Sequence, residues 1–242
     1  MTLNIPTHKS ILLQILKDIY SNTNLSPYLG FKGGTAAYLF YNLERFSVDL
    51  DFDLLDETKE EQVFSEIERI VRNYGQIKEA RKKRFNLFFL LSYEEKAQNT
   101  KIEINRRTFG SRYEIKTYLG ISMLVMIKED MFAHKLMAMH ERMGKSNRDI
   151  FDVWFFLKNN WSINKKIVEE RSQISFAKLL DKCITQLKKT TSRNILDGMG
   201  ELLNEKQKSW AKTSLIPDTI FLLKLMRENE KQTPQTGLEA GD

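Results

Sequence analysis

Cysteine, proline and glycine are all scarce in this chain of 242 residues. Its one cysteine, Cys183, excludes an intrachain disulfide and a zinc cluster built on several thiolates. Four prolines and eleven glycines exclude a collagen-like or linker-dominated architecture. No apolar run approaches the ~20 residues of a membrane-spanning helix, so we expect no membrane partner. The first ten residues lack the pattern of a secretory signal, and we therefore expect a reducing, cytoplasmic environment.

The composition is that of a folded protein with a modest basic surplus. Hydrophobic residues make up 41% of the chain, which suffices for a core and excludes global disorder. The net charge is +6, with an acidic stretch at residues 49–68 and most of the basic surplus beyond residue 100. This distribution is compatible with a nucleotide or nucleic-acid partner, and equally with an ordinary solvated surface.

Hydrophobic periodicity predicts an α+β chain in which a mixed sheet with flanking helices precedes a helical part. We expect a mixed module over 1–125, a helical domain over 126–229 and a disordered tail over 230–242. The nearly continuous apolar run at 85–91 predicts a central strand. The predicted strands span 28–31, 47–55, 76–92 and 100–107, and the predicted helices span 9–20, 35–43, 58–73, 127–142, 147–158, 164–171, 175–189, 192–203 and 217–228.

A double glycine follows the first predicted strand. Gly33 and Gly34 would let the backbone approach a ligand closely, and the next helix would offer its free N–H groups to a phosphate. Thr35 would add a hydroxyl donor to that phosphate. By itself the same pattern is also typical of a simple tight turn.

Acidic residues alternate along the strand predicted at 47–55. Asp49 and Asp51 are two residues apart, so both carboxylates project from one face of the sheet. Two like charges this close are unfavourable unless they are solvated, protonated or bridged by a cation. Carboxylate oxygens suit Mg²⁺, and also Mn²⁺. The alternative interpretation is a solvated sheet face.

These two motifs lie about fifteen residues apart, and together they carry a resemblance. Gly33-Gly34-Thr35 followed by Arg45-Phe46-Ser47-Val48-Asp49-Leu50-Asp51 resembles the polymerase-β-like nucleotidyltransferase superfamily, and more narrowly the AbiEii/MenT toxin family. That family has a GG-[ST] turn and an R-x-S-x-D-h-D strand. Residues 127–136, with an A-x-K-L pattern, and 148–153, with R-D-h-x-D, match two of its helices.

The resemblance assigns a metal-binding role to the acidic strand and a nucleotidyltransferase core to residues 1–125. Asp49 and Asp51 would hold Mg²⁺ ions that position a nucleoside triphosphate and activate an acceptor hydroxyl. Glu103 is the expected third ligand, although the superfamily more often has aspartate there. Asp53 is the rival third ligand, or else a solvated charge on the strand.

The resemblance also assigns roles to the two helical motifs. Lys135 would neutralise charge on the triphosphate, and Lys128, seven residues earlier on the same basic stripe, is a second candidate for binding the nucleotide. The alternative for both is an ordinary surface lysine. In the second motif we expect Asp152 to be catalytic and Asp149 to be more structural. The alternative for Asp149 is an N-terminal helix charge in an ion pair.

Arg45 and Ser47 complete the expected nucleotide-binding set. Arg45 would contact a phosphate or orient Asp49, and a purely structural salt bridge is an equal alternative. We expect the histidines to be non-catalytic because none has a cysteine or histidine at ligand spacing; they are His8, His134 and His140.

The function implied by the resemblance is metal-dependent transfer of a nucleotide. The enzyme would move NMP from an NTP to an acceptor hydroxyl, with release of pyrophosphate. It would act as the toxin of a bacterial toxin–antitoxin or abortive-infection system. The acceptor would be RNA, at the 3′ end of tRNA, and the antitoxin would be encoded separately. Two alternatives stay open: transfer to a protein or small molecule, and a non-catalytic nucleotide-binding regulator.

Overall fold

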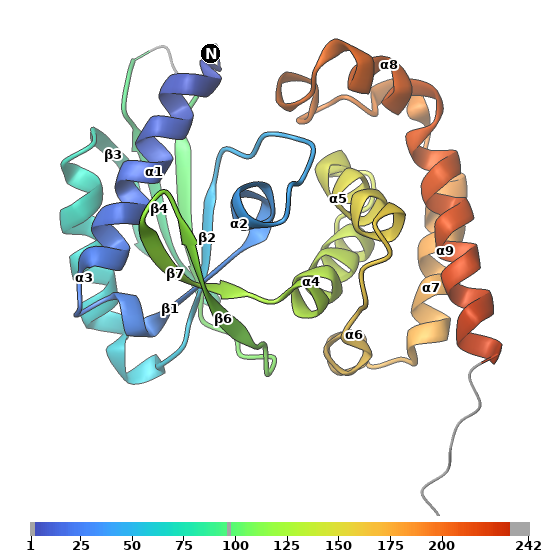
Figure 1. Cartoon of the computed structure of the whole chain (residues 1–242), viewed down its shortest axis with the longest axis horizontal. Helices are drawn as coiled ribbons and strands as arrows, with labels where there is room; N and C mark the ends of the chain where they lie inside the picture. The colour runs from blue at the N-terminus through green and yellow to red at the C-terminus, as the bar shows by residue number, and fades with distance from the viewer. Residues whose placement is uncertain (1–2, 96–97, 233–242) are drawn as a thin grey trace, which may run out of the picture.

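A mixed sheet of seven strands organises the first half of the chain (Figure 1). The protein was analysed as a computed structural model that describes residues 3–95 and 98–232. The spatial order of the strands is β3-β4-β5-β2-β1-β7-β6. β2 pairs in parallel with β5, and β1 with β7, whereas the other neighbours are antiparallel. The strands are β1 (Leu29–Lys32), β2 (Leu50–Leu54), β3 (Gln76–Lys82), β4 (Asn86–Ser92), β5 (Thr100–Asn105), β6 (Tyr113–Tyr118) and β7 (Ile121–Met126).

The alternation along β2 separates the two faces of the sheet. Leu50, Phe52 and Leu54 are buried under α1 (Ile5–Ser21) and α3 (Glu60–Arg72), where Phe52 contacts the ring of Tyr20. α2 (Gly33–Phe40) covers part of the other face, which carries Asp51. Both α1 and α3 are amphipathic, and each buries its apolar stripe against the sheet.

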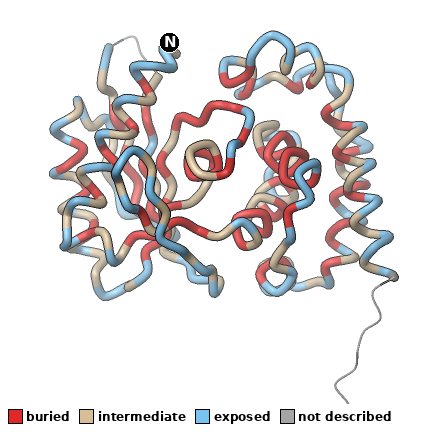
Figure 2. Tube along the Cα trace, in the orientation of Figure 1, coloured by how far each residue is buried: buried red, intermediate tan, exposed pale blue. Residues whose placement is uncertain are grey.

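Beyond β7 the described chain consists of helices joined by loops and short 3₁₀ turns (Figure 1). Figure 2 shows buried positions along the inward faces of these helices. α9 packs on both α5 and α7, and the aromatic side chains of Phe156 and Trp161 stack with ring centroids 4.1 Å apart. The helices are α4 (Lys128–Glu141), α5 (Asn147–Lys158), α6 (Lys165–Ser172), α7 (Phe176–Lys189), α8 (Glu205–Thr213) and α9 (Leu215–Gln232).

The expected α+β class, with a mixed sheet and flanking helices followed by further helices, is confirmed. Within residues 3–95 and 98–232, no helix combines the length and the apolar character needed to cross a bilayer.

Several local predictions differ from the structure. The strand at 85–91 is not central: β4 is second from the edge of the sheet, and α3 packs against it. Residues 192–203 form two 3₁₀ turns instead of a helix. The hairpin of β6 and β7 and the helix α8 were not predicted. α9 continues through Gln232, so residues 230–232 are helical, and the rest of the predicted tail, 233–242, lies outside the described residues.

Candidate active site

Strand register places two carboxylates and an ammonium group side by side on one face of the sheet. Asp51 on β2 is the Cα partner of Lys32 on β1 and of Glu103 on β5. Paired residues on neighbouring strands point to the same face, so the three side chains form one row. This row lies at a cavity of about 430 Å³, which is closed on its other side by residues of α4 and α6 that include His134, Lys135 and Arg171.

The Asp51 carboxylate lacks a compensating partner. It makes no hydrogen bond or ion pair with any residue in 3–95 or 98–232. Burial, together with the negative charges of Asp49 and Glu103, raises the pKa of Asp51 to about 6, against the opposing charges of Lys135 and Lys32. The Asp51 carboxylate is therefore repelled by two neighbouring carboxylates, and a bound cation would relieve that repulsion.

The donor set fits a divalent cation that prefers oxygen ligands. Asp51 and Glu103 present carboxylate oxygens to the same cavity, which is the chemistry that Mg²⁺ and Mn²⁺ favour. Glu103 accepts a hydrogen bond of 3.0 Å from the Asn86 amide, which orients it. The structure does not bring the three predicted ligands around one point, because the described residues contain no group of three acidic, histidine or cysteine side chains close enough to share a metal.

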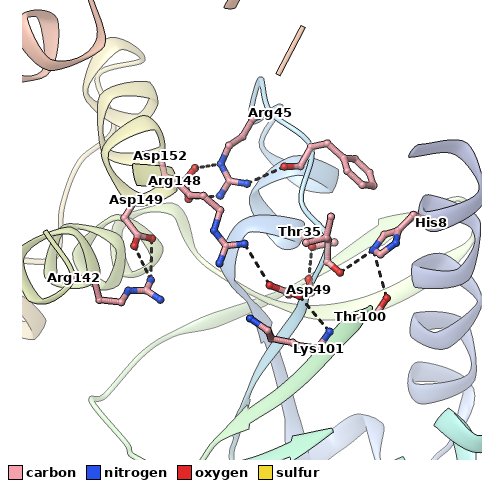
Figure 3. Close-up of polar contacts among 12 residues, drawn as sticks. His8, Thr35, Arg45, Asp49, Thr100, Lys101, Arg142, Arg148, Asp149 and Asp152 are labelled. Atoms are coloured by element: carbon pink, nitrogen blue, oxygen red, sulfur yellow. Dashed lines mark hydrogen bonds and ion pairs between the residues drawn. The ribbon is translucent and has the colours of Figure 1, made fainter. Parts of the chain in front are cut away.

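Asp49 lies beside the cavity and is held by other groups (Figure 3). Its carboxylate is 3.4 Å from the Arg148 guanidinium and accepts a hydrogen bond of 3.3 Å from the Lys101 N–H. Its backbone carbonyl accepts a hydrogen bond from the Thr35 hydroxyl. The structure therefore brings Asp51 and Glu103 together, and places Asp49 at their margin in an ion pair with α5.

The residues of the glycine turn pack against the loop before β2 and offer few hydrogen-bond donors to a phosphate. Thr35 is buried, and because its hydroxyl already donates to Asp49 it does not face a phosphate as expected. A Cβ on Gly34 would lie 2.7 Å from the Ser47 hydroxyl oxygen and 3.0 Å from the Arg45 guanidinium. Ser47 is also buried. Thr35, Gly34 and Ser47 fix the loop before β2, whereas Gly33 lines the cavity.

Gly33 is required for both its conformation and the space beside it. Its φ of +79° lies in the left-handed region, and a Cβ there would lie 2.3 Å from the Asp51 Oδ2. We expect Gly33→Ala to displace the Asp51 carboxylate and to slow by about 100-fold any reaction that this site supports. Gly120→Ala is the matched control, because Gly120 has the same φ of +79° with nothing within 4 Å. This control should lose only about 1–2 kcal/mol of stability and should keep its activity.

Asp53 is not available as the rival metal ligand. Its carboxylate is ion-paired with the Lys32 ammonium at 2.5 Å and accepts hydrogen bonds from Asn105 and Tyr113. Although burial opposes it, the charge of Lys32 and these hydrogen bonds lower the pKa of Asp53 below its ordinary value. A buried carboxylate with this many donors is already compensated.

A buried ion-pair network holds Lys135 at the cavity. The Lys135 ammonium lies 2.7 Å from Asp152 and 3.4 Å from Asp149. Asp152 is fully buried and also receives two hydrogen bonds, of 2.6 and 2.7 Å, from the Arg45 guanidinium (Figure 3). Burial raises the pKa of Asp152, but the positive charges of Arg45 and Lys135 outweigh burial and lower this pKa to about 2. Of the alternatives for Arg45, the structure therefore shows the salt bridge.

Asp149 belongs to the same network on α5. It is buried, and its Oδ2 lies 2.8 Å from the Arg142 guanidinium. Arg148 points the other way, toward Asp49 (Figure 3). Burial lowers the pKa of Arg148, but the surrounding carboxylates, chiefly that of Asp49, outweigh burial and raise it above its ordinary value.

Lys128 does not reach the cavity. Its ammonium lies over the rings of Tyr41 and Trp161, 5.5 and 5.3 Å from their centroids. Lys128 and Lys135 share a helix face, but two helical turns separate them by about 10 Å along the axis. The structure consequently assigns Lys128 to a different surface.

Sequence reasoning missed several side chains that line the cavity. Lys32 directly precedes Gly33, so its position at the strand end was the one available signal. The others come from distant segments: Asn86, Asn105, Arg107 and Arg171. Arg142, seven residues after Lys135, continues the basic stripe of α4 and also lines the cavity. His134, expected to be non-catalytic, also lines the cavity; burial and the charge of Lys32 lower its pKa to about 3, so its ring is neutral at pH 7.

The chain is similar to known proteins in both sequence and structure. The family model described as "Nucleotidyl transferase AbiEii toxin, Type IV TA system" matches residues 14–213. A solved structure of a candidate nucleotidyltransferase from H. pylori is similar to the chain with a TM-score of 0.61 and 19% identity, covering 97% of this chain and 99% of its own. The structure of JHP933 from Helicobacter pylori gives a TM-score of 0.58 and 20% identity, covering 96% of each chain. No curated protein matches the chain.

Proposed function

Since the chain belongs to the AbiEii family of nucleotidyl transferase toxins, we propose that it transfers NMP from an NTP to a hydroxyl of RNA, at the 3′ end of tRNA, as the toxin of a type IV toxin–antitoxin system. The observation that carries the proposal is the uncompensated carboxylate of Asp51 beside Glu103, facing Lys135 across one cavity. A type IV system implies an antitoxin, which we propose is encoded separately.

The cavity has the charges that an NTP and a divalent cation require together. Asp51 and Glu103, joined by Asp49, would hold Mg²⁺ or Mn²⁺, which when bound supplies Lewis-acid stabilisation of the phosphoryl oxygens. The cations of Lys135 and Arg107 line the same cavity and would neutralise the triphosphate.

The chemical step is an in-line displacement at the α-phosphorus. The acceptor oxygen forms the new P–O bond as the bond to pyrophosphate breaks, and the acceptor proton leaves to solvent. Lys135 offsets the charge that develops on the leaving pyrophosphate. Asp152 and Asp149 act as positioning residues, because their contacts hold the Lys135 ammonium at the cavity.

The test is transfer of label from NTP to RNA. The protein is incubated with NTPs labelled at the α-phosphate, Mg²⁺ and total RNA. We expect label in RNA, release of pyrophosphate, and a loss of rate of about 100-fold or more in Lys135→Met. Lys166→Met, which changes an exposed lysine on α6, is the matched control and should transfer at the wild-type rate.

Each alternative gives a different result. Label in protein or in small molecules would replace RNA as the acceptor. A non-catalytic regulator would release no pyrophosphate, and calorimetry would show NTP binding that survives substitution of both Asp49 and Asp51 by asparagine.

A further inference from the structure

We propose that a groove beside the nucleotide cavity binds a single-stranded segment of the RNA acceptor and leads its end to Asp49 and Asp51. The groove is a cavity of about 630 Å³ between the α4–α5 turn, the end of α7 and the turns that follow α7. The inference rests on the proposed function, since it names the place where the acceptor of that reaction binds.

The two cavities adjoin along the chain. Arg142 at the end of α4 lines the nucleotide cavity, and the next residue, Met143, lines the groove. At the start of α5, Asn147 lines the groove, and the next residue, Arg148, contacts Asp49. A strand lying in the groove would therefore reach the acidic cluster past Arg142 and Arg148.

The groove carries side chains that typically contact a nucleic-acid backbone. Lysine, asparagine, glutamine and threonine side chains line it, and such side chains contact phosphate and sugar oxygens in protein–nucleic acid complexes. Among the described residues that line the groove, Asp197 is the one acidic side chain. Asn147 and Thr190 already donate to backbone carbonyls, which leaves Lys145, Gln186, Lys189, Thr191 and Asn194 as the donors.

This chemistry favours RNA over a protein acceptor. Protein interfaces concentrate aromatic and apolar anchors at a dry centre. The described lining of the groove contains no aromatic residue, and Met143 is its one large apolar side chain. The groove therefore lacks both the anchors of a protein interface and a platform for base stacking, and RNA would be held there through its backbone. Lys145 and Lys189 are exposed at the groove, where each could contact a phosphate.

The experiment measures RNA binding separately from transfer. Binding of a short fluorescein-labelled single-stranded RNA is followed by anisotropy for the full-length wild type and for Lys145→Glu/Lys189→Glu. We expect the Kd to rise by about 10-fold or more, and the salt dependence to fall by about 0.7 in log–log slope for each lysine that contacts a phosphate. In Lys145→Gln/Lys189→Gln the Kd for RNA should also rise, but by less than in the glutamate variant.

Controls separate this proposal from the proposed function. Lys17→Glu, on an exposed position of α1, should bind RNA as the wild type does. NTP binding measured by calorimetry should be unchanged in the groove variants. If the wild type labels RNA but both groove variants bind RNA normally, the groove proposal is wrong while the proposed function stands. If the wild type labels only protein, and the groove variants lose that labelling, the groove binds a protein acceptor and the RNA assignment is wrong.

Discussion

Asp51→Asn is expected to abolish nucleotide transfer and, at the same time, to raise the melting temperature at pH 8. Activity should fall by at least about 1,000-fold, because we propose the Asp51 carboxylate as a ligand of the cation that transfer requires. The same repulsion makes the ionised carboxylate unfavourable in the folded state.

The pH dependence of stability follows from the direction of the pKa shift. The folded state raises the pKa of Asp51 from its ordinary 3.8 to about 6, so it binds this proton more tightly than the unfolded state does. The stability contributed by the proton is present below pH 3.8 and is lost as pH rises through 6. Asparagine removes this dependence, so thermal unfolding should show a larger gain for Asp51→Asn at pH 8 than at pH 5.

The gain in melting temperature of Asp51→Asn can be compared with the effect of a control substitution on the same strand, Asp53→Asn. Relief of about 1 kcal/mol corresponds to about 2–4 °C in a protein of this size. Asp53→Asn should instead lower the melting temperature, because Asp53 is ion-paired with Lys32 and its pKa is lowered. Melting temperatures that fall equally in both variants would contradict the assignment of Asp51 as the uncompensated carboxylate.

Asp152→Asn is expected to give the largest loss of stability. Asp152 is fully buried between Arg45 and Lys135, and removing its charge leaves the Arg45 guanidinium buried without a counter-ion. Breaking a buried pair in this way costs about 3–5 kcal/mol. Denaturant unfolding at pH 7 measures the loss, and transfer should also fall because Lys135 is no longer positioned.

Acid gives an independent check on the same pair. The folded pKa of Asp152, about 2, is below its ordinary 3.8, so its stabilising contribution is complete above pH 3.8 and is lost as pH falls toward 2. The acid-induced loss should be smaller in Asp152→Asn. Asp181→Asn, which breaks an exposed ion pair with Arg227, is the control and should cost less than about 1 kcal/mol. An equal cost for the two variants would contradict the buried network.

The acidic strand could be predicted because its information is local. Alternation along residues 47–55 assigns Asp51 and Asp53 to one face without knowledge of any other strand. It could not distinguish them, because the difference arises from neighbours. Asp53 meets Asn105 and Tyr113, whereas Asp51 meets Glu103, and these pairings depend on strand order and register.

The donors and cations of the site were harder to predict for the same reason. The glycine turn predicts the Thr35 hydroxyl as a phosphate donor, but in the folded chain this hydroxyl donates to the Asp49 carbonyl. Lys128 and Lys135 were expected on one stripe, yet Tyr41 and Trp161 pack beside the first and the acidic residues of α5 beside the second. The β6–β7 hairpin is hard to predict because apolar residues in β6 and in the turn, Ile115 and Leu119, are exposed, so apolar positions here do not mark a buried face.

The central claim is that Asp51 and its neighbouring carboxylates bind a divalent cation together with a nucleotide. The most direct measurement is a titration of Mn²⁺ into the wild type and into Asp51→Asn, followed by electron paramagnetic resonance in the presence of a non-hydrolysable NTP. The account predicts protein-bound Mn²⁺ in the wild type and its loss in the variant. Equal Mn²⁺ binding by both proteins, with the nucleotide bound, would contradict it.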